Sequence, residues 1–394
     1  MRNIIITGGE LFNKGAQAMT FVTVNEIKKR YPNHRIFLLS EMDLARKEEE
    51  RTIYAFDFTG WYPIKFAKAQ SNPFLRLLYK IRHAREFAAA EHLYKNCDMM
   101  IDISGYALGS NWDVRNNSRY LDHLEFARAF NIPVYLMPQS FGPFDFGSEH
   151  PGIDKRCRKL LPACKAILAR EQEGYDALVN TYGLTNVRLA PDLVLNNKGI
   201  DLANVFKEIP PMDLPEITPG SIAIVPNGRN LSVGNDEEVL ALYQAAIRCG
   251  LEQGKTVYLL HHATSDAALC AQLKARFADT ARVVLPDKEF SCLEFNELVQ
   301  KFDYLVASRF HSIVHAYKNA IPCVILGWAK KYEDLSAQFD QRAYLFDVRK
   351  RVEANALCLA MERINGARDK ESKRIKDLLA GLQEKNVFDI LVAK

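Results

Sequence analysis

The feature that most constrains the fold is a series of short, continuous apolar runs that each end in a polar or glycine-containing loop. The clearest runs are residues 3–7, 99–104, 134–138, 221–226, 255–260 and 304–307. Continuous aliphatic runs of this length are typical of parallel strands buried on both faces. Amphipathic stretches such as 16–30 and 237–253 lie between them and predict helices. The alternation therefore predicts an α/β protein with parallel sheets.

The series occurs twice, on either side of residues 196–220. This segment carries Pro210, Pro211, Pro215 and Pro219 and has weak periodicity, as expected of a linker. We predict a Rossmann-like domain over residues 1–200, a second over 220–345 and a helical tail over 346–394. Two such domains facing across a cleft form the glycosyltransferase-B arrangement, which by itself does not give a function.

Composition excludes several classes of protein. The 52 Lys and Arg residues nearly balance the 48 Asp and Glu residues, and the net charge of +4 is too mild to indicate nucleic-acid binding. The eight cysteines form no C-x-x-C pair and no zinc spacing, so we expect reduced core cysteines and no metal site. No segment approaches the roughly 20 apolar residues of a membrane helix. We expect a cytoplasmic protein.

The stretch 304–327 predicts an anion site with a proton donor beside it. An apolar run ends at Ser308, Arg309 and His311 follow, and a helical pattern and a second apolar run come next. In open α/β sheets, ligands bind outside the carboxyl ends of the strands, where this turn falls. A helix N-terminus at that point favours anions, because its backbone N–H groups are free.

The loop after residues 3–7 is a further candidate. It contains Gly8, Gly9 and Gly15 together with Asn13 and Lys14, which can donate hydrogen bonds to a ligand. The spacing matches neither the dinucleotide fingerprint nor the Walker loop. The alternative is a tight turn with a helix cap.

Residues 65–95 are both basic and apolar. Lys65, Lys68, Arg76 and Lys80 are interleaved with residues such as Phe74. Such a segment can make peripheral contact with the inner membrane surface. The alternative is a solvated helix packed on its own sheet.

Several ordered motifs between residues 4 and 332 resemble those of the polysaccharide pyruvyl transferase family. The most specific is Ser308-Arg309-Phe310-His311, similar to S-R-x-H, followed by the strand after Pro322 and by Lys330 or Lys331. Earlier segments resemble the family's G-x-x-N-x-G-D/A, Q-x-x-G-P, A-R-E/D and P-D elements: Asn13-Lys14-Gly15-Ala16, Gln139-Ser140-Phe141-Gly142-Pro143, Ala169-Arg170-Glu171 and Ala190-Pro191-Asp192. Two departures are Ala16, where an acidic residue is common, and Ser104-Gly105-Tyr106, where a G-G-G-like loop is usual.

The resemblance implies transfer of a pyruvyl group from phosphoenolpyruvate, a co-substrate, to two hydroxyls of a sugar or lipid-linked oligosaccharide. A cyclic ketal forms and phosphate leaves, and no further cofactor is implied. We assign His311 as general acid and Arg309 with Arg170 as clamps for the anionic donor. Donor contacts are also assigned to Ser308, Lys330, Lys331 and His262, and the acceptor side to Asn13, Lys14, Gly15, Gln139 and Gly142.

Four further residues have two interpretations each. His261 and His262 follow a strand and either contact the cleft or pack beside it. His315 lies one turn after His311, where packing is the better interpretation. Asp192 either holds Arg170 or caps a helix.

Two other functions fit the same pattern. A glycosyltransferase that uses a nucleotide sugar would also need a basic residue for the diphosphate, together with a carboxylate base. A sugar- or anion-binding module without turnover is the second alternative, although the intact set of Ser308, Arg309 and His311 argues against it. Thermal stabilisation by phosphoenolpyruvate or by nucleotide sugars distinguishes the two enzymes.

Overall fold

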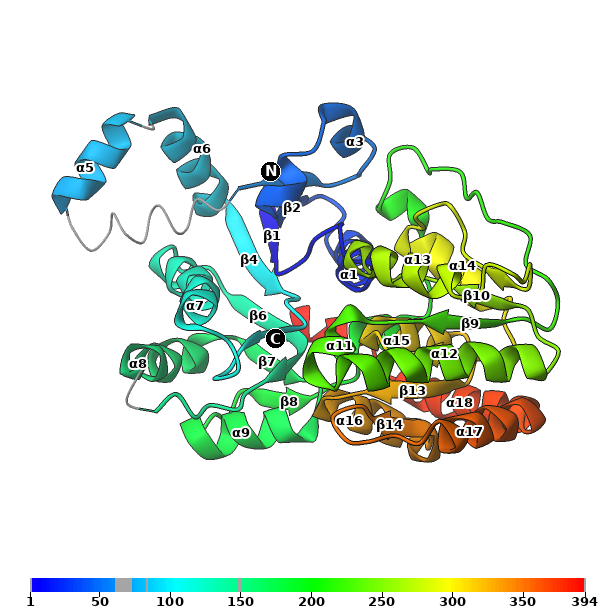
Figure 1. Cartoon of the computed structure of the whole chain (residues 1–394). Helices are drawn as coiled ribbons and strands as arrows, with labels where there is room; N and C mark the ends of the chain where they lie inside the picture. Colours follow the sequence, from blue (N-terminus) through cyan, green and yellow to red (C-terminus); the bar gives the residue numbers. More distant parts are fainter. Residues whose placement is uncertain (1, 61–72, 83, 148–149, 393–394) are drawn as a thin grey trace.

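The computed structural model describes residues 2–60, 73–82, 84–147 and 150–392, and contains two parallel sheets that lie in separate halves of the molecule (Figure 1). The first sheet has the strand order β3-β2-β1-β4-β6-β7-β8, with β5 paired to β6. Its strands are β1 (Asn3–Thr7), β2 (Arg35–Leu39), β3 (Asp57–Thr59), β4 (Cys97–Asp102), β5 (Tyr106–Leu108), β6 (Val134–Phe141), β7 (Ala166–Ala169) and β8 (Val187–Leu189).

The second sheet has the order β11-β10-β9-β12-β13-β14. Its strands are β9 (Ile222–Val225), β10 (Val257–Leu259), β11 (Val283–Val284), β12 (Leu305–Ala307), β13 (Cys323–Gly327) and β14 (Leu345–Asp347). The order reverses between β1 and β4 in one sheet and between β9 and β12 in the other. Such reversals open a crevice at the carboxyl ends of the strands, so the loops after β1, β4 and β12 are placed to form a site.

Helices connect and cover both sheets. Those of the first half are α1 (Lys14–Arg30), α2 (Glu41–Leu44), α3 (Glu48–Thr52), α5 (Pro73–Arg82), α6 (Ala84–Lys95), α7 (Val114–Ala129), α8 (Pro151–Leu160), α9 (Gln172–Tyr182) and α10 (Leu193–Asn196), with 3-10 turns η1 (Leu161–Ala163) and η2 (Leu202–Asn204). Those of the second half are α11 (Gly228–Val233), α12 (Asp236–Glu252), α13 (Ala267–Ala275), α14 (Cys292–Val299), α15 (Phe310–Lys318), α16 (Lys330–Gln338), α17 (Ala354–Gly366) and α18 (Arg368–Leu382), with η3 (Thr264–Asp266), η4 (Arg342–Tyr344) and η5 (Val387–Leu391).

One apolar core joins the two halves. It runs without interruption from Ile4 and Phe21 of the first half to Phe295 and Ile313 of the second. The seam is formed by α1 and α10 against α14 and α15. Buried polar contacts reinforce it, since the Cys292 N–H donates to the side-chain oxygen of Gln17 on α1 at 2.7 Å. Large apolar interfaces of this kind restrict the relative motion of domains.

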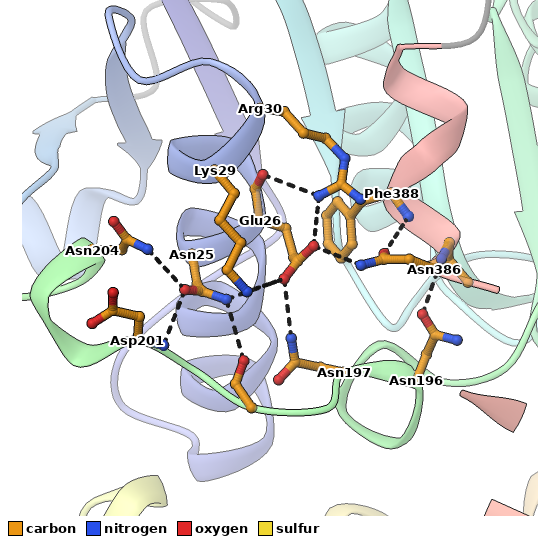
Figure 2. A network of polar contacts seen from close by, with 12 residues as sticks. Asn25, Glu26, Lys29, Arg30, Asn196, Asn197, Asp201, Asn204, Asn386 and Phe388 are labelled. Carbon is orange, nitrogen blue, oxygen red and sulfur yellow. Dashed lines mark hydrogen bonds and ion pairs between the residues drawn. The ribbon is translucent and has the colours of Figure 1, made fainter. Parts of the chain in front are cut away.

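The C-terminal tail returns to the first half. Figure 2 shows η5 lying beside α1, where Glu26 accepts hydrogen bonds from Arg30 and Asn386 at 2.5 and 2.7 Å. Asn196 donates to the carbonyl of Leu382 at the end of α18 at 2.7 Å and to that of Lys385, just after it, at 2.8 Å. The tail therefore bridges both halves rather than extending the second one alone.

Three local predictions need correction. The helix expected from residue 16 begins at Lys14, because the side chain of Asn13 caps it by accepting from the N–H groups of Gly15 and Ala16. The loop expected from Gln139 is strand as far as Phe141, since β5 extends the pairing of β6. Residues 73–82 and 84–95 form two helices, whereas Lys65 and Lys68 lie outside the described residues. No described helix is long and apolar enough to cross a membrane.

Candidate active site

A cavity of about 560 Å³ opens where the loops after β1 and β4 face the N-terminal turns of α15 and α16. Among the residues that line it are Glu10, Asn13, Asp102, Tyr106, Trp112, Arg119, Arg170, Phe310, His311 and Lys331. Its walls therefore come from both halves of the chain. A second hollow of about 620 Å³ lies beside the network of Figure 2. None of the predicted site residues lines this hollow, whereas Asn13, Arg170, His311 and Lys331 line the first cavity, so we assign the chemistry to the first cavity.

His311 is a largely buried titratable group of this cavity. It lies in the first turn of α15, directly after β12, and its side chain is 15% exposed. Nε2 lies 3.7 Å from Asp192, beyond hydrogen-bond range, and has no partner among the described residues. Burial lowers the pKa of His311 to about 4, with Asp192 opposing and Arg170 and Lys331 adding to the effect. In the free protein the imidazole is therefore neutral at pH 7.

Arg170 reaches the cavity from the end of β7. It donates to Glu171 at 2.8 Å, Asp192 at 3.1 Å and the hydroxyl of Ser140 at 2.8 Å. Its guanidinium lies 4.3 Å from the centre of the Phe310 ring, so it already contacts the second half of the chain. Arg170 therefore lies at the seam between the two halves, beside the helix that carries His311.

Asp192 links Arg170 to His311. One carboxylate oxygen caps α10 by accepting from the Val194 N–H at 2.9 Å, and the other accepts from Arg170 and faces His311. Burial alone would raise the pKa of Asp192, but His311 and Arg170 hold it below its usual value. Both interpretations of Asp192, holding Arg170 and capping a helix, describe the structure.

Lys331 and Lys330 have different environments. Lys331 lines the cavity, and burial together with Arg170 lowers its pKa to about 8. No carboxylate of the described residues lies within ion-pair distance of it. Lys330 is 52% exposed and pairs with Glu333 and Asp334 of its own helix. Lys331 is therefore the lysine available for an anion in the cavity.

Arg309 is not among the residues that line the cavity. Its guanidinium forms a bidentate pair with Asp266, with distances of 2.6 and 2.7 Å. Ser308 is fully buried and accepts a hydrogen bond from the Tyr243 hydroxyl at 2.9 Å. In this arrangement both residues fix the turn that presents His311 rather than lining the cavity themselves.

The loop after β1 packs directly on His311. A Cβ atom on Gly15 would lie 2.4 Å from the His311 ring, so only glycine allows this approach. Lys14 is buried and pairs with Glu289 at 3.4 Å, and burial lowers its pKa. Asn13 lines the cavity while capping α1. Of these three predicted acceptor residues, only Asn13 lies in the cavity lining.

Gln139 and Gly142 lie behind the cavity wall. The Gln139 side chain is completely buried, donates to Asp102 at 2.9 Å and accepts from Tyr120 at 3.2 Å. Gly142 accepts from the Tyr106 hydroxyl through its carbonyl at 2.9 Å. Both residues can position the wall, but neither reaches an acceptor directly.

The remaining histidines form a packed group. His262 is 2% exposed, and its ring lies 5.0 Å from Phe295 and 5.8 Å from His315. His315 Nδ1 lies 3.3 Å from the Asn296 side chain. Burial lowers the pKa values of His261, His262 and His315. The predicted donor contact of His262 would need a rearrangement of this packing.

The sequence analysis missed several cavity residues, among them Glu10, Asp102, Tyr106 and Trp112. Asp102 ends β4 and accepts hydrogen bonds from Thr7, Ser104 and Gln139, while Glu10 has its pKa raised by burial and by Asp43. Tyr106 and Trp112 form an aromatic wall with ring centres 5.5 Å apart. A carboxylate at the carboxyl end of a buried strand was the signal for Asp102. For Trp112 the signal was an aromatic residue in a glycine-rich loop.

Comparison with known proteins agrees with this architecture. The sequence profile described as polysaccharide pyruvyl transferase matches residues 13–330, which is most of the chain. No curated protein matches significantly. In the described part of the chain, no group of three or more His, Cys, Asp or Glu side chains could hold a metal ion.

Solved structures match over nearly the whole chain. UDP-GlcNAc 2-epimerase from Methanocaldococcus jannaschii is 12% identical with a TM-score of 0.58, covering 97% of this chain and 100% of its own. The glycotransferase of kitacinnamycin is 10% identical with a TM-score of 0.58, covering 99% and 98%. Anabaena Alr3699/HepE, solved with UDP and glucose, is 10% identical with a TM-score of 0.54, covering 99% and 97%. At these identities the likeness shows the fold alone, which is the glycosyltransferase-B arrangement.

Proposed function

The chain belongs to the polysaccharide pyruvyl transferase family, and from this premise we propose that it moves the pyruvyl group of phosphoenolpyruvate onto two hydroxyls of a sugar. The products are a cyclic ketal and phosphate. One observation carries the proposal: His311, whose buried Nε2 atom has no hydrogen-bond partner among the described residues, shares a cavity with Arg170 and Lys331. A trianionic donor needs such cations, and its methylene carbon needs a proton.

The donor binds between Lys331 and Arg170. Phosphoenolpyruvate carries a carboxylate and a phosphate of roughly −1.5 to −2 charge, and Lys331 lacks an ion-pair partner among the described carboxylates. The N-terminal turn of α15 adds backbone N–H groups at the same wall. Arg309 contributes by holding that turn in place through Asp266.

Donor binding charges His311. The imidazole is neutral in the free protein because burial and two neighbouring cations lower its pKa. An anionic donor opposes both cations, so it raises that pKa and the ring takes up a proton. Protonated His311 then delivers this proton to the methylene carbon, which becomes the methyl group, and leaves an oxocarbenium-like centre at the carbon that bears phosphate.

Two sugar hydroxyls complete the ketal. The first attacks the oxocarbenium-like carbon and loses its proton to Glu10, whose raised pKa suits a base. Asp102 is less suited, because Thr7, Ser104 and Gln139 already occupy its oxygens. Glu10 returns this proton to the bridging oxygen as the carbon–oxygen bond breaks and hydrogen phosphate leaves. The second hydroxyl then closes the ring and gives its proton to His311, which restores the imidazolium.

The acceptor lies against Trp112 and Tyr106. Trp112 is 37% exposed at the cavity, and its ring pairs with that of Tyr106. The C–H-bearing face of a sugar ring packs well on an aromatic face, whose π-electrons attract the partly positive hydrogens. This wall comes from the first half of the chain, opposite His311. The acceptor is a soluble or lipid-linked sugar whose identity the screen below determines.

An acceptor screen with phosphoenolpyruvate tests the proposal. We expect release of inorganic phosphate that depends on the acceptor, and a product whose mass increases by the pyruvate ketal. We also expect phosphoenolpyruvate, added without an acceptor, to raise the melting temperature of the protein. If nucleotide sugars stabilise the protein, phosphoenolpyruvate does not, and sugar transfer follows instead, the proposal fails in favour of a glycosyltransferase.

A further inference from the structure

The helix α5 carries an exposed apolar face. Phe74, Leu77, Leu78 and Ile81 are 68%, 57%, 48% and 71% exposed. Their spacing of i, i+3, i+4 and i+7 places them on one side of the helix. Single exposed leucines such as Leu359 are ordinary, but four large apolar side chains in contact with solvent on one face indicate an interaction surface.

The face is held away from the second half of the protein. Figure 1 shows α5 and α6 at the outer edge of the first half, on the side opposite α12 and α17. Helix α6 anchors the pair, since Ala90, Leu93 and Tyr94 are buried in the core of the first half. None of the described residues of α5 belongs to a core cluster. The face is therefore presented outward on an anchored support.

The charge of this segment identifies the partner. Across residues 58–85 there is no Asp or Glu, whereas the chain as a whole has 48 acidic and 52 basic residues. The basic residues in the segment are Lys65, Lys68, Arg76, Lys80, Arg82 and Arg85. Apolar side chains flanked by cations match a surface of anionic headgroups over acyl chains. A second copy of the chain, pairing the same face by two-fold symmetry, would instead bring these like charges together.

We propose that α5 docks the protein on an anionic phospholipid bilayer, with Phe74, Leu77, Leu78 and Ile81 entering the boundary between headgroups and acyl chains. Arg82, which is exposed on the same helix, contacts lipid phosphates. The inference does not depend on the reaction proposed above. It predicts a protein that associates reversibly with such a surface and whose binding weakens in salt.

Vesicle sedimentation with the full chain tests this inference. The probes are vesicles of phosphatidylglycerol mixed equally with phosphatidylcholine, and vesicles of phosphatidylcholine alone. We expect binding to the mixed vesicles at low salt, and binding weaker by about tenfold or more to neutral vesicles or at high salt. Absence of binding to the mixed vesicles would overturn the inference.

Matched variants locate the contact. Leu77→Gln with Leu78→Gln should weaken binding by about tenfold or more, while helix content is kept because Gln and Leu have similar helix propensities. The control is Leu359→Gln with Leu378→Gln, which removes exposed leucines from α17 and α18 and should bind like the wild type. If both double variants bind the mixed vesicles equally well, the apolar face of α5 is not the lipid contact.

A charge variant and the oligomeric state complete the test. Arg76→Gln with Arg82→Gln keeps the apolar face and removes two of the six basic residues, so it should reduce the preference for anionic over neutral vesicles. An unchanged preference in this variant contradicts the electrostatic part of the inference. Light scattering measures the oligomeric state. If the wild type is a dimer and Leu77→Gln with Leu78→Gln is a monomer, the apolar face of α5 binds a second copy of the chain, and the inference is overturned.

Discussion

At the scale of single residues, the proposed chemistry depends most on His311. Its Nε2 is buried and makes no hydrogen bond to any described residue, so it can donate to a group that enters the cavity. We expect His311→Gln to lower kcat by about 100- to 10,000-fold, because the proton for the methylene carbon is lost. Binding of phosphoenolpyruvate, measured by calorimetry, should change little, because Arg170 and Lys331 remain.

His315→Gln is the matched control for that variant. His315 lies on the same helix and is also buried, but it packs against Phe295. It should keep kcat within a few-fold of the wild type. Full turnover by His311→Gln would remove the imidazole from the mechanism.

Lys331 and Lys330 offer a neighbouring pair for the phosphate contact. We expect Lys331→Met to raise the KM for phosphoenolpyruvate by about 10- to 100-fold, the loss of one charge-assisted contact. Lys330→Met should change it less than about twofold, because Lys330 is 52% exposed and pairs with Glu333. Steady-state kinetics compares the two. A larger effect at Lys330 would contradict the assignment.

The choice between these lysines could not be made from the sequence. Both follow β13 by a similar number of residues, and only the start of α16 decides which side chain turns inward. The turn at Ser308, Arg309 and His311 was predictable, because a buried run followed by a helical pattern fixes its position. The partner that holds Arg309, Asp266, lies 43 residues earlier in the chain, and such a distant pair leaves no local signal.

At the scale of elements, the contact between α1 and α15 sets the position of His311. Gly15→Ala would place a methyl group 2.4 Å from the ring. Alanine normally stabilises a helix by about 1 kcal/mol over glycine, but this overlap costs about 1–3 kcal/mol. We therefore expect a lower or unchanged free energy of unfolding in urea, together with reduced kcat.

Gly381→Ala is the control for this substitution. Gly381 lies in α18 with open space around its Cβ position, so alanine there should raise the free energy of unfolding by about 0.5–1 kcal/mol. If Gly15→Ala keeps full kcat and gains as much stability as Gly381→Ala, then the packing of α1 on His311 has no functional role.

The loop after β5 provides the aromatic wall for the acceptor. We expect Trp112→Ala to raise the KM for the sugar acceptor by about tenfold and to leave the KM for phosphoenolpyruvate nearly unchanged. Phe12→Ala is the control, because Phe12 is 40% exposed but lies outside the cavity lining with Arg46 over its ring. Initial rates at varied concentrations of each substrate separate the two effects. An equal rise in both KM values would place Trp112 elsewhere in the mechanism.

At the scale of the whole molecule, the fold was predictable and the seam between its halves was not. Alternating apolar runs and helical patterns predict two parallel sheets because strand and helix periods differ. The apolar core that joins α1 to α14 and α15 has no such signature. An apolar helix face has the same residue pattern whether it packs on its own sheet or on another domain. The role of Gln139 was equally hard to predict. Its motif predicts a site residue, but only the fold shows that Gln139 is buried outside the cavity lining and donates a hydrogen bond to Asp102.

Buried histidines make the stability of the whole chain depend on pH. Burial lowers the pKa values of His123 and His315 to about 3 and that of His311 to about 4. The unfolded chain has ordinary pKa values near 6.5, so it binds more protons than the folded chain between these limits. Stability is therefore complete above about pH 6.5 and falls as the pH drops towards the folded values.

A variant lacking one of these histidines should lose part of that dependence. We expect the free energy of unfolding to fall between about pH 6.5 and pH 5, and His315→Gln to reduce this fall by about 1.5 kcal/mol. Urea unfolding at the two pH values measures it, and carboxylates contribute little because they titrate mainly below this range. His34→Gln is the control variant for the loss of a histidine, since His34 is partly exposed and pairs with Asp98 at 2.7 Å. The fall in its free energy of unfolding is compared with that of His315→Gln. An equal fall in the wild type and in His315→Gln would mean that His315 is not held neutral in the folded protein.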